Sequence, residues 1–340
     1  MIRIARALLV CAVAVACVGC APARSPERRG SEAAPLARAN LTEYVPAAGL
    51  RWLAVARLAE LARMPEMRSS IELLFPSARL DAFASATGLD LRTTPVAAAA
   101  GFDLATLFLA ETPWENALIE RKFIERLTAP VRAETSARGV RRVSGTVGLT
   151  PETLVRAEGR FVGVSVGDPT PARVAALYAE GRLGRSPPAL KGSALSTLHE
   201  DLSEAPLRFY APGPFSDEWA RGARGLLGVT LALGVAAYPE ADTLRIVAVL
   251  SGRWNGADVA QLEAAWNDLA TSSLGRLLGL DQPVSPAEVT VSDDQLALRV
   301  RLARLPLVTG LRAAVAADVW EFLKVPNTPK IAPTAPAAPS

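Results

Sequence analysis

One short stretch of the 340-residue sequence has the residue types of a hydrolytic site. The pentapeptide GVSVG at 163–167 matches the G-x-S-x-G pattern, in which a serine on a sharp strand-to-helix turn acts as a nucleophile. Here valines alternate on both sides of Ser165 as in a strand, and the next helix is predicted to begin only after Pro169. We therefore expect Ser165 to lie inside a strand, where glycines let a helix approach closely.

The single histidine, His199, is the other candidate for chemistry, because Glu200 and Asp201 follow it directly. Transition-metal sites usually combine several histidine or cysteine ligands, and one histidine cannot supply such a set. The sequence also contains no phosphate-binding loop, dinucleotide-binding fingerprint or EF-hand spacing. We expect no metal and no other cofactor, and we expect His199 to be a solvated surface residue.

The three cysteines, at positions 11, 17 and 20, all lie in or beside a leader-like segment. Arg3 and Arg6 precede a 12-residue apolar run from Ala7 to Val18, which ends in small residues. This layout is typical of a secretory signal peptide, and the run is too short for a comfortable membrane-spanning helix. Cleavage after Gly19 would leave one cysteine, so we expect no disulfide and no cysteine-ligated metal in the mature chain.

The end of this segment, Cys17-Val18-Gly19-Cys20, resembles the lipobox of bacterial lipoproteins. The resemblance implies that the thiol of Cys20 receives a diacylglyceryl group and that the leader is removed between Gly19 and Cys20. The first lipobox position is usually Leu, Val or Ile, whereas here it is Cys17, and an overlapping frame ending at Cys17 is the alternative. A third possibility is an ordinary secretory leader with incidental cysteines. Several acyl chains anchor a protein stably to a bilayer.

Composition excludes several classes of protein. Half of the residues are hydrophobic and 21% are charged, which is too apolar for a disordered chain. The formal net charge is +3, and loss of Arg3 and Arg6 with the leader lowers it to +1. This leaves no strongly basic field, so nucleic acid is not an expected partner. The body is similar in composition to uncharacterised envelope lipoproteins of high-GC bacteria.

Periodicity and punctuation divide the chain into six parts. We predict a signal peptide at 1–19, a lipidated cysteine with a tether at 20–46, a first module at 47–185, a linker at 186–205, a second module at 206–324 and a Pro/Ala-rich tail at 325–340. Within the second module, 216–227 is predicted as a helix. Strand and helix signals follow a similar order in both modules. The predicted fold class is α+β, with two related ferredoxin-like (split β-α-β) modules, each an antiparallel sheet covered by helices.

These observations favour a membrane-anchored envelope lipoprotein that is not an enzyme and that binds or braces another envelope component. The first alternative is a solute-binding lipoprotein with its pocket between the two modules. The second, less favoured, is a serine hydrolase that uses Ser165. Trp114, in the sequence ETPWE, is a candidate contact for a protein partner, although packing onto the following helix is the favoured explanation.

Overall fold

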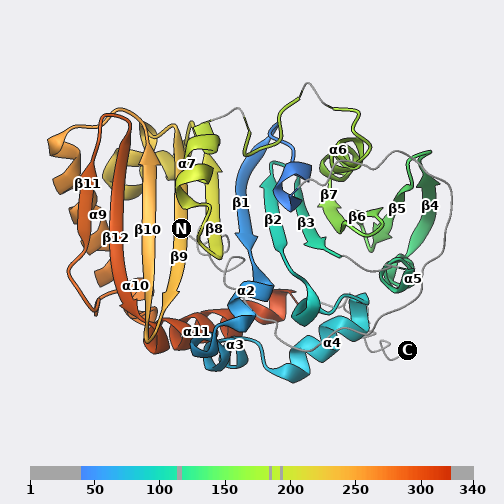
Figure 1. The fold of residues 1–340 in the computed structure, drawn as a ribbon, viewed down its shortest axis with the longest axis horizontal. Coiled ribbons are helices and arrows are strands. Elements are labelled where there is room, and N and C mark those ends of the chain that lie inside the picture. Colours follow the sequence, from blue (N-terminus) through green and yellow to red (C-terminus); the bar gives the residue numbers. More distant parts are fainter. Residues whose placement is uncertain (1–39, 113–116, 184–185, 192–193, 323–340) are drawn as a thin grey trace, which may run out of the picture.

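The structure is a computed structural model, and it describes residues 40–112, 117–183, 186–191 and 194–322. Within these residues, twelve strands form a single antiparallel sheet that runs across the whole molecule (Figure 1). The strands are β1 (Leu50–Ala56), β2 (Ala97–Phe102), β3 (Ala105–Glu111), β4 (Ala129–Thr135), β5 (Val140–Val147), β6 (Thr150–Ala157), β7 (Phe161–Gly167), β8 (Leu207–Pro212), β9 (Ala232–Glu240), β10 (Thr243–Ser251), β11 (Glu288–Val291) and β12 (Gln295–Ala303).

Helices connect these strands and cover both faces of the sheet. The α-helices are α2 (Leu58–Arg63), α3 (Arg68–Leu74), α4 (Ser77–Thr87), α5 (Ala117–Arg126), α6 (Thr170–Ala179), α7 (Ala194–Leu202), α8 (Asp217–Ala220), α9 (Gly256–Thr271), α10 (Ser273–Leu277) and α11 (Arg304–Phe322). Four 3-10 helices are η1 (Leu41–Tyr44), η2 (Pro65–Met67), η3 (Leu91–Thr93) and η4 (Gly222–Gly228).

The predicted α+β class is confirmed. The sequence predicted a separate sheet in each module, whereas the described strands form one continuous sheet. The strand order is β11-β12-β10-β9-β8-β1-β2-β3-β7-β6-β5-β4. Strand β1 joins the two halves because it pairs with β8, with Leu53 opposite Tyr210 and Val55 opposite Arg208. We call η1 to α6 the first half and α7 to α11 the second half. Ferredoxin-like modules are not confirmed, since β1-β2-β3 and β8-β9-β10 are neighbours in chain order rather than interleaved.

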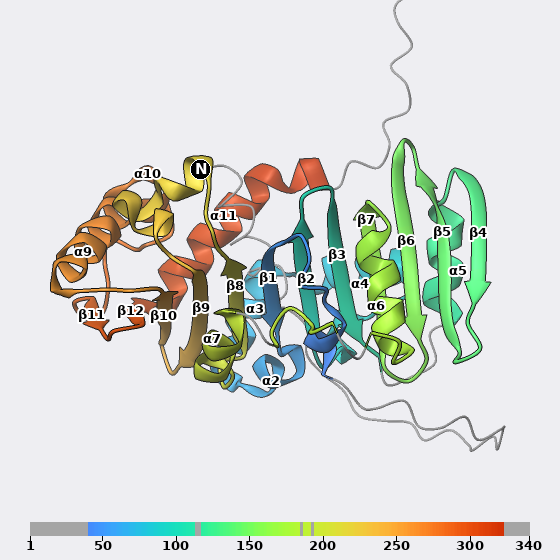
Figure 2. The same ribbon diagram turned by 90° about the horizontal axis from the view of Figure 1, so that it is seen from above.

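Side chains alternate between the two faces of the sheet along each strand, so the buried residues show which helices cover each face. On the face that carries Leu53, Val55 and Tyr210, one large apolar core packs beneath η1, α6 and α7. We call this the cavity face. On the opposite face, α5 covers residues such as Val143 of the first half, and α9 covers residues such as Leu296 of the second. Figure 2 shows α7 on one side of the sheet and α9 and α10 on the other.

Two segments differ from the sequence-based expectation. The stretch at 186–205, expected to be a linker, contains α7, whose Leu195, Leu198 and Leu202 are buried against β8 and β9. Its prolines and glycines suggested a linker, but the leucine spacing gives a short helix an apolar stripe. The helix predicted at 216–227 is interrupted: α8 ends at Ala220, and Ala223 and Arg224 inside η4 adopt left-handed backbone angles that break the helical progression.

Among the helices of the described residues, none combines the length and the hydropathy that are needed to cross a bilayer.

Candidate functional site

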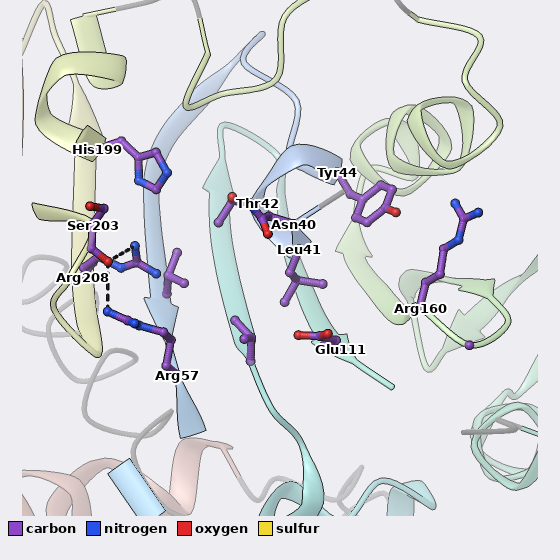
Figure 3. Close-up of a pocket in the computed structure, with 13 residues that line it drawn as sticks. Asn40, Leu41, Thr42, Tyr44, Arg57, Glu111, Arg160, His199, Ser203 and Arg208 are labelled. Carbon is purple, nitrogen blue, oxygen red and sulfur yellow. Dashed lines mark hydrogen bonds between the residues drawn. The ribbon is translucent and has the colours of Figure 1, made fainter. Parts of the chain in front are cut away.

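The two halves enclose a cavity of about 660 Å³ on the cavity face, between η1 and α7 (Figure 3). Its floor is formed by β1 and β8 at the junction of the halves, together with Val96, which directly precedes β2. The first half contributes Asn40, Leu41, Thr42, Tyr44, Val55, Arg57, Val96, Glu111, Gly159 and Arg160, and the second half contributes His199, Ser203 and Arg208. This volume is in the ordinary range for a site that holds a small organic molecule.

Two arginines from different halves meet at the end of α7. Arg57, which follows β1, donates from Nη2 to the Ser203 carbonyl oxygen at 2.9 Å and also to the carbonyl of Glu204. Arg208 on β8 donates from Nη1 to the same Ser203 oxygen at 3.0 Å. The last carbonyls of a helix have no intrahelical partner and carry partial negative charge, so they attract such cations. The contacts fix both guanidinium groups at one end of the cavity.

These two arginines differ in how their charge is balanced. The guanidinium of Arg57 also forms an ion pair with Glu60, with 2.9 Å between Nη1 and Oε2. Arg208 is only 8% exposed, and among the described residues no carboxylate lies within ion-pair distance of it. Burial lowers the pKa of Arg208, which reflects the cost of keeping its charge away from water. The two arginines share one feature: among the described residues, the buried Nε atoms of Arg57 and Arg208 both have no hydrogen-bond acceptor.

The opposite end of the cavity is built by η1, β3 and the β6–β7 turn. Tyr44 is 3% exposed and stacks on Phe161, with ring centroids 4.2 Å apart. Its hydroxyl is buried beside the guanidinium group of Arg160. Burial raises the pKa of Tyr44, and the positive charge of nearby Arg160 partly opposes this effect. Glu111, at the end of β3, is half-buried, and burial raises its pKa as well.

His199 lies at the same end of the cavity as Arg57 and Arg208, and it is not the solvated residue that we expected. It projects from α7, is half-buried, and its Nδ1 lies 3.2 Å from the hydroxyl of Tyr210. Burial lowers the pKa of His199, and the charge of Arg208 acts in the same direction. Burial raises the pKa of Tyr210 to about 12. At neutral pH the histidine therefore adds a polar, uncharged ring to the wall of the cavity.

The remaining candidates from the sequence are not part of this cavity. Ser165 lies inside β7 and is fully buried, and its Oγ donates to the carbonyl oxygen of Asp168 at 2.8 Å. It does not line the cavity with His199. Gly19, Cys20 and Trp114 lie outside the described residues, so the lipidation site and the possible partner contact have no structural description.

The charged side chains that line the cavity are mostly positive. Three arginines and one glutamate line it, and two of those arginines point their guanidinium groups toward the same end. Arginine guanidinium groups bind carboxylates and phosphates in well-defined geometry, and the interaction strengthens away from bulk water. Within the described residues, no group of three or more histidine, cysteine, aspartate or glutamate side chains is placed to hold a metal ion.

Apart from His199, sequence reasoning did not identify the residues of this cavity. One local signal was available: Arg208 and Tyr210 alternate with apolar residues in the strand LRFYA, so a charged side chain had to share the buried face of a strand. The meeting of Arg208 with Arg57 depends on the pairing of β1 with β8, which the local sequence does not encode.

Comparisons with known proteins give little further information. No protein-family model matches the chain, and no curated protein is similar to it at a significant level. Among solved structures, one titled "Structure of crystal form III of TP0453" is similar, with 10% sequence identity and a TM-score of 0.47 over 81% of this chain and 98% of that one. Crystal form I of the same protein gives 10% identity and a TM-score of 0.44 over 82% of this chain and 98% of that one.

Proposed function

We propose that this chain is a lipid-anchored protein of the bacterial envelope that binds a small organic anion in the cavity between its halves, without catalysing a reaction on it. Export and anchoring rest on the leader and on the lipobox-like residues that end at Cys20. Of the binding and bracing roles that the sequence left open, the cavity favours binding. The finer proposal that the halves are related modules rests only on their similar element order.

The observation that carries the binding function is the buried, unbalanced charge of Arg208. Burying a cation without a counter-ion is costly, and proteins usually pair such a charge or leave it exposed. Arg208 lines a cavity large enough for a ligand, and a carboxylate or phosphate placed there would supply the missing counter-ion. A brace between envelope components has no need of this arrangement.

Calorimetric titration of the purified protein in detergent with a panel of small carboxylates and phosphate esters tests the binding function. We expect at least one of these anions to bind, and Arg208→Met to weaken its binding about tenfold or more, since charge-assisted hydrogen bonds are lost. Arg299→Met, which removes an exposed arginine from β12, is the matched control and should leave the affinity unchanged. If no anion in the panel binds, or if both variants bind equally well, the proposed function is wrong.

Metabolic labelling with a fatty acid tests the anchor separately. We expect label in the wild-type protein and in Cys17→Ala, and none in Cys20→Ala, because the proposal places the acyl group on Cys20, after Gly19, and not on Cys17 of the overlapping frame. Label that persists in Cys20→Ala, or a freely soluble wild-type product that keeps its leader, would contradict the anchoring proposal. This result would not affect the cavity, which is built from residues 40–208.

A further inference from the structure

The charged groups of the cavity are separated into two sets with an apolar middle. Arg57, Arg208 and His199 lie at one end, while Glu111 and Arg160 lie at the other (Figure 3). Between them the lining is formed by Leu41, Val55 and Val96, together with the polar side chains of Asn40 and Thr42. A ligand that fills this space must therefore be elongated and must carry polar groups at both ends.

The first end requires one negative charge from a ligand. The charge of Arg57 is already balanced by Glu60, and its Nη2 is occupied by the carbonyls that follow α7. Arg208 donates from Nη1 to Ser203 but has no carboxylate partner among the described residues. A single carboxylate beside Arg208 would neutralise the one uncompensated cation at this end.

The second end presents one anion and one cation that do not satisfy each other. Glu111 has no ion pair or side-chain hydrogen bond to any described residue, and no described carboxylate pairs with Arg160. The buried hydroxyl of Tyr44 lies close to both groups, and the charges of Arg160 and Glu111 act on it in opposite directions. A ligand group that contains both an ammonium and a carboxylate would pair with Glu111 and Arg160 at once.

Building on the proposed function, we infer that the ligand is a short acidic peptide bound end to end, with an acidic residue at its N-terminus. Its α-ammonium pairs with Glu111, its first side-chain carboxylate with Arg160, and its C-terminal carboxylate with Arg208. The peptide's two negative charges and one positive charge complement the unpaired charges of the site. A cavity of about 660 Å³ is too large for one amino acid and suits a drug-sized ligand.

The apolar middle agrees with a peptide of small residues. Leu41 and Val55 are buried and give a dry wall for methyl side chains, whereas Asn40 and Thr42 offer hydrogen bonds to peptide groups. A long hydrocarbon chain would leave these polar groups and Glu111 without partners, which costs binding free energy. A simple monocarboxylate would satisfy only the end that contains Arg208.

The test is calorimetric titration of the full-length protein with the tripeptide glutamyl-alanyl-alanine and three modified forms of it. N-acetylation removes the ammonium, replacement of glutamate by glutamine removes the side-chain carboxylate, and C-terminal amidation removes the last carboxylate. We expect each modification to weaken binding to the wild type about tenfold or more. Because these comparisons use the unaltered protein, they do not depend on the folding of any variant.

Matched variants then assign each charge to its partner. In Glu111→Gln, N-acetylation should change the affinity by less than about twofold, because its partner is already absent. Likewise, Arg160→Gln should bind the glutamine peptide about as tightly as the glutamyl peptide. Arg208→Met should bind the amidated peptide about as tightly as the free peptide. Arg299→Met should respond to all three modifications as the wild type does.

Other outcomes separate this inference from the proposed function. If the N-acetylated peptide or a plain monocarboxylate binds as tightly as the free tripeptide, the cavity takes anions but the peptide assignment is wrong. If the matched variants respond to the wrong modifications, the end-to-end placement is wrong. If neither peptides nor other anions bind, both the inference and the proposed function fail.

Discussion

At the scale of single residues, the site is a compromise between stability and binding. Arg208 sits on a strand face that otherwise carries apolar residues such as Val55 and Tyr210 of the same core. Its buried charge lowers the stability of the ligand-free protein, while the same charge supplies the affinity for an anion. Functional groups that are stabilised only when a ligand is present commonly show this opposition.

This opposition predicts that Arg208→Met loses ligand binding but does not lose stability. Without ligand at neutral pH, we expect the free energy of unfolding to stay equal or rise by about 1 kcal/mol or more, because an unpaired buried cation is replaced by an apolar side chain of similar length. The Ser203 carbonyl keeps its hydrogen bond from Arg57. Urea unfolding measures the change, and a loss of more than about 2 kcal/mol would show that Arg208 is a structural residue.

His199 makes the stability depend on pH in a defined direction. The groups that face it are Tyr210, Arg208 and Glu200, and burial followed by the charge of Arg208 depresses its folded pKa below 6.5. Below about pH 6.5 the unfolded chain therefore binds a proton that the folded chain does not, so stability falls as the pH decreases from 7 toward 5.

We expect His199→Asn to show a shallower loss of stability between pH 7 and pH 5 than the wild type, as measured by urea unfolding at each pH. The raised pKa of Glu111 acts in the opposite direction at the acidic end, and it is present in both proteins, so the comparison isolates the histidine. Identical slopes for the two proteins would show that His199 titrates as it does in the unfolded chain.

At the scale of elements, local pattern predicted most strands and helices but failed where tertiary contacts decide. Helix α7 is short and is flanked by residues typical of linkers, so only the spacing of its leucines indicated a helix. Its place is fixed by β9, where an added Cβ at Gly234 would lie 2.7 Å from Leu202 Cδ1. Strand β4 was not predicted because every residue in it is exposed, so it shows no apolar alternation.

Packing of helix α7 against the core should therefore stabilise the fold, which a solvated linker would not do. Leu198 is fully buried in the large core, and Leu198→Ala should lower the free energy of unfolding by about 2 to 5 kcal/mol. It should also weaken ligand binding, because α7 carries His199 and orients Ser203. The control is Leu149→Ala, at a leucine that is 99% exposed, which should change stability by less than about 0.5 kcal/mol.

The prediction for α7 depends on the difference in stability between Leu198→Ala and Leu149→Ala. Thermal unfolding followed by circular dichroism is sufficient to compare them. Equal stability of the two variants would show that the segment at 186–205 is a linker in solution, as the sequence first indicated.

At the scale of the whole molecule, the continuous sheet determines what the sequence could reveal. The α+β class follows from local patterns, but the single sheet follows from the pairing of Leu53 with Tyr210 and of Val55 with Arg208. The paired residues are distant in the sequence, and the local sequence of neither strand indicates which strand it pairs with. The same pairing creates the cavity, so the site was hidden from sequence analysis for the same reason as the sheet. Local pattern pointed only to His199, and the pairing of β1 with β8 brings the other cavity residues to it.

A core that crosses the junction should also make the two halves unfold together. The large cluster on the cavity face includes Leu107 and Phe161 of the first half and Tyr210 and Val249 of the second, with no break at β1. We expect one calorimetric transition, with calorimetric and van't Hoff enthalpies that agree. An anion that binds between the halves should move this whole transition upward, by about 2.7 kcal/mol of stability when its concentration is about a hundredfold above Kd. Arg208→Met, which lacks the counter-charge, should still unfold in one step but show no shift with the anion. Two transitions, of which the ligand moved only one, would mean that the halves are independent domains and that the cavity belongs to one of them.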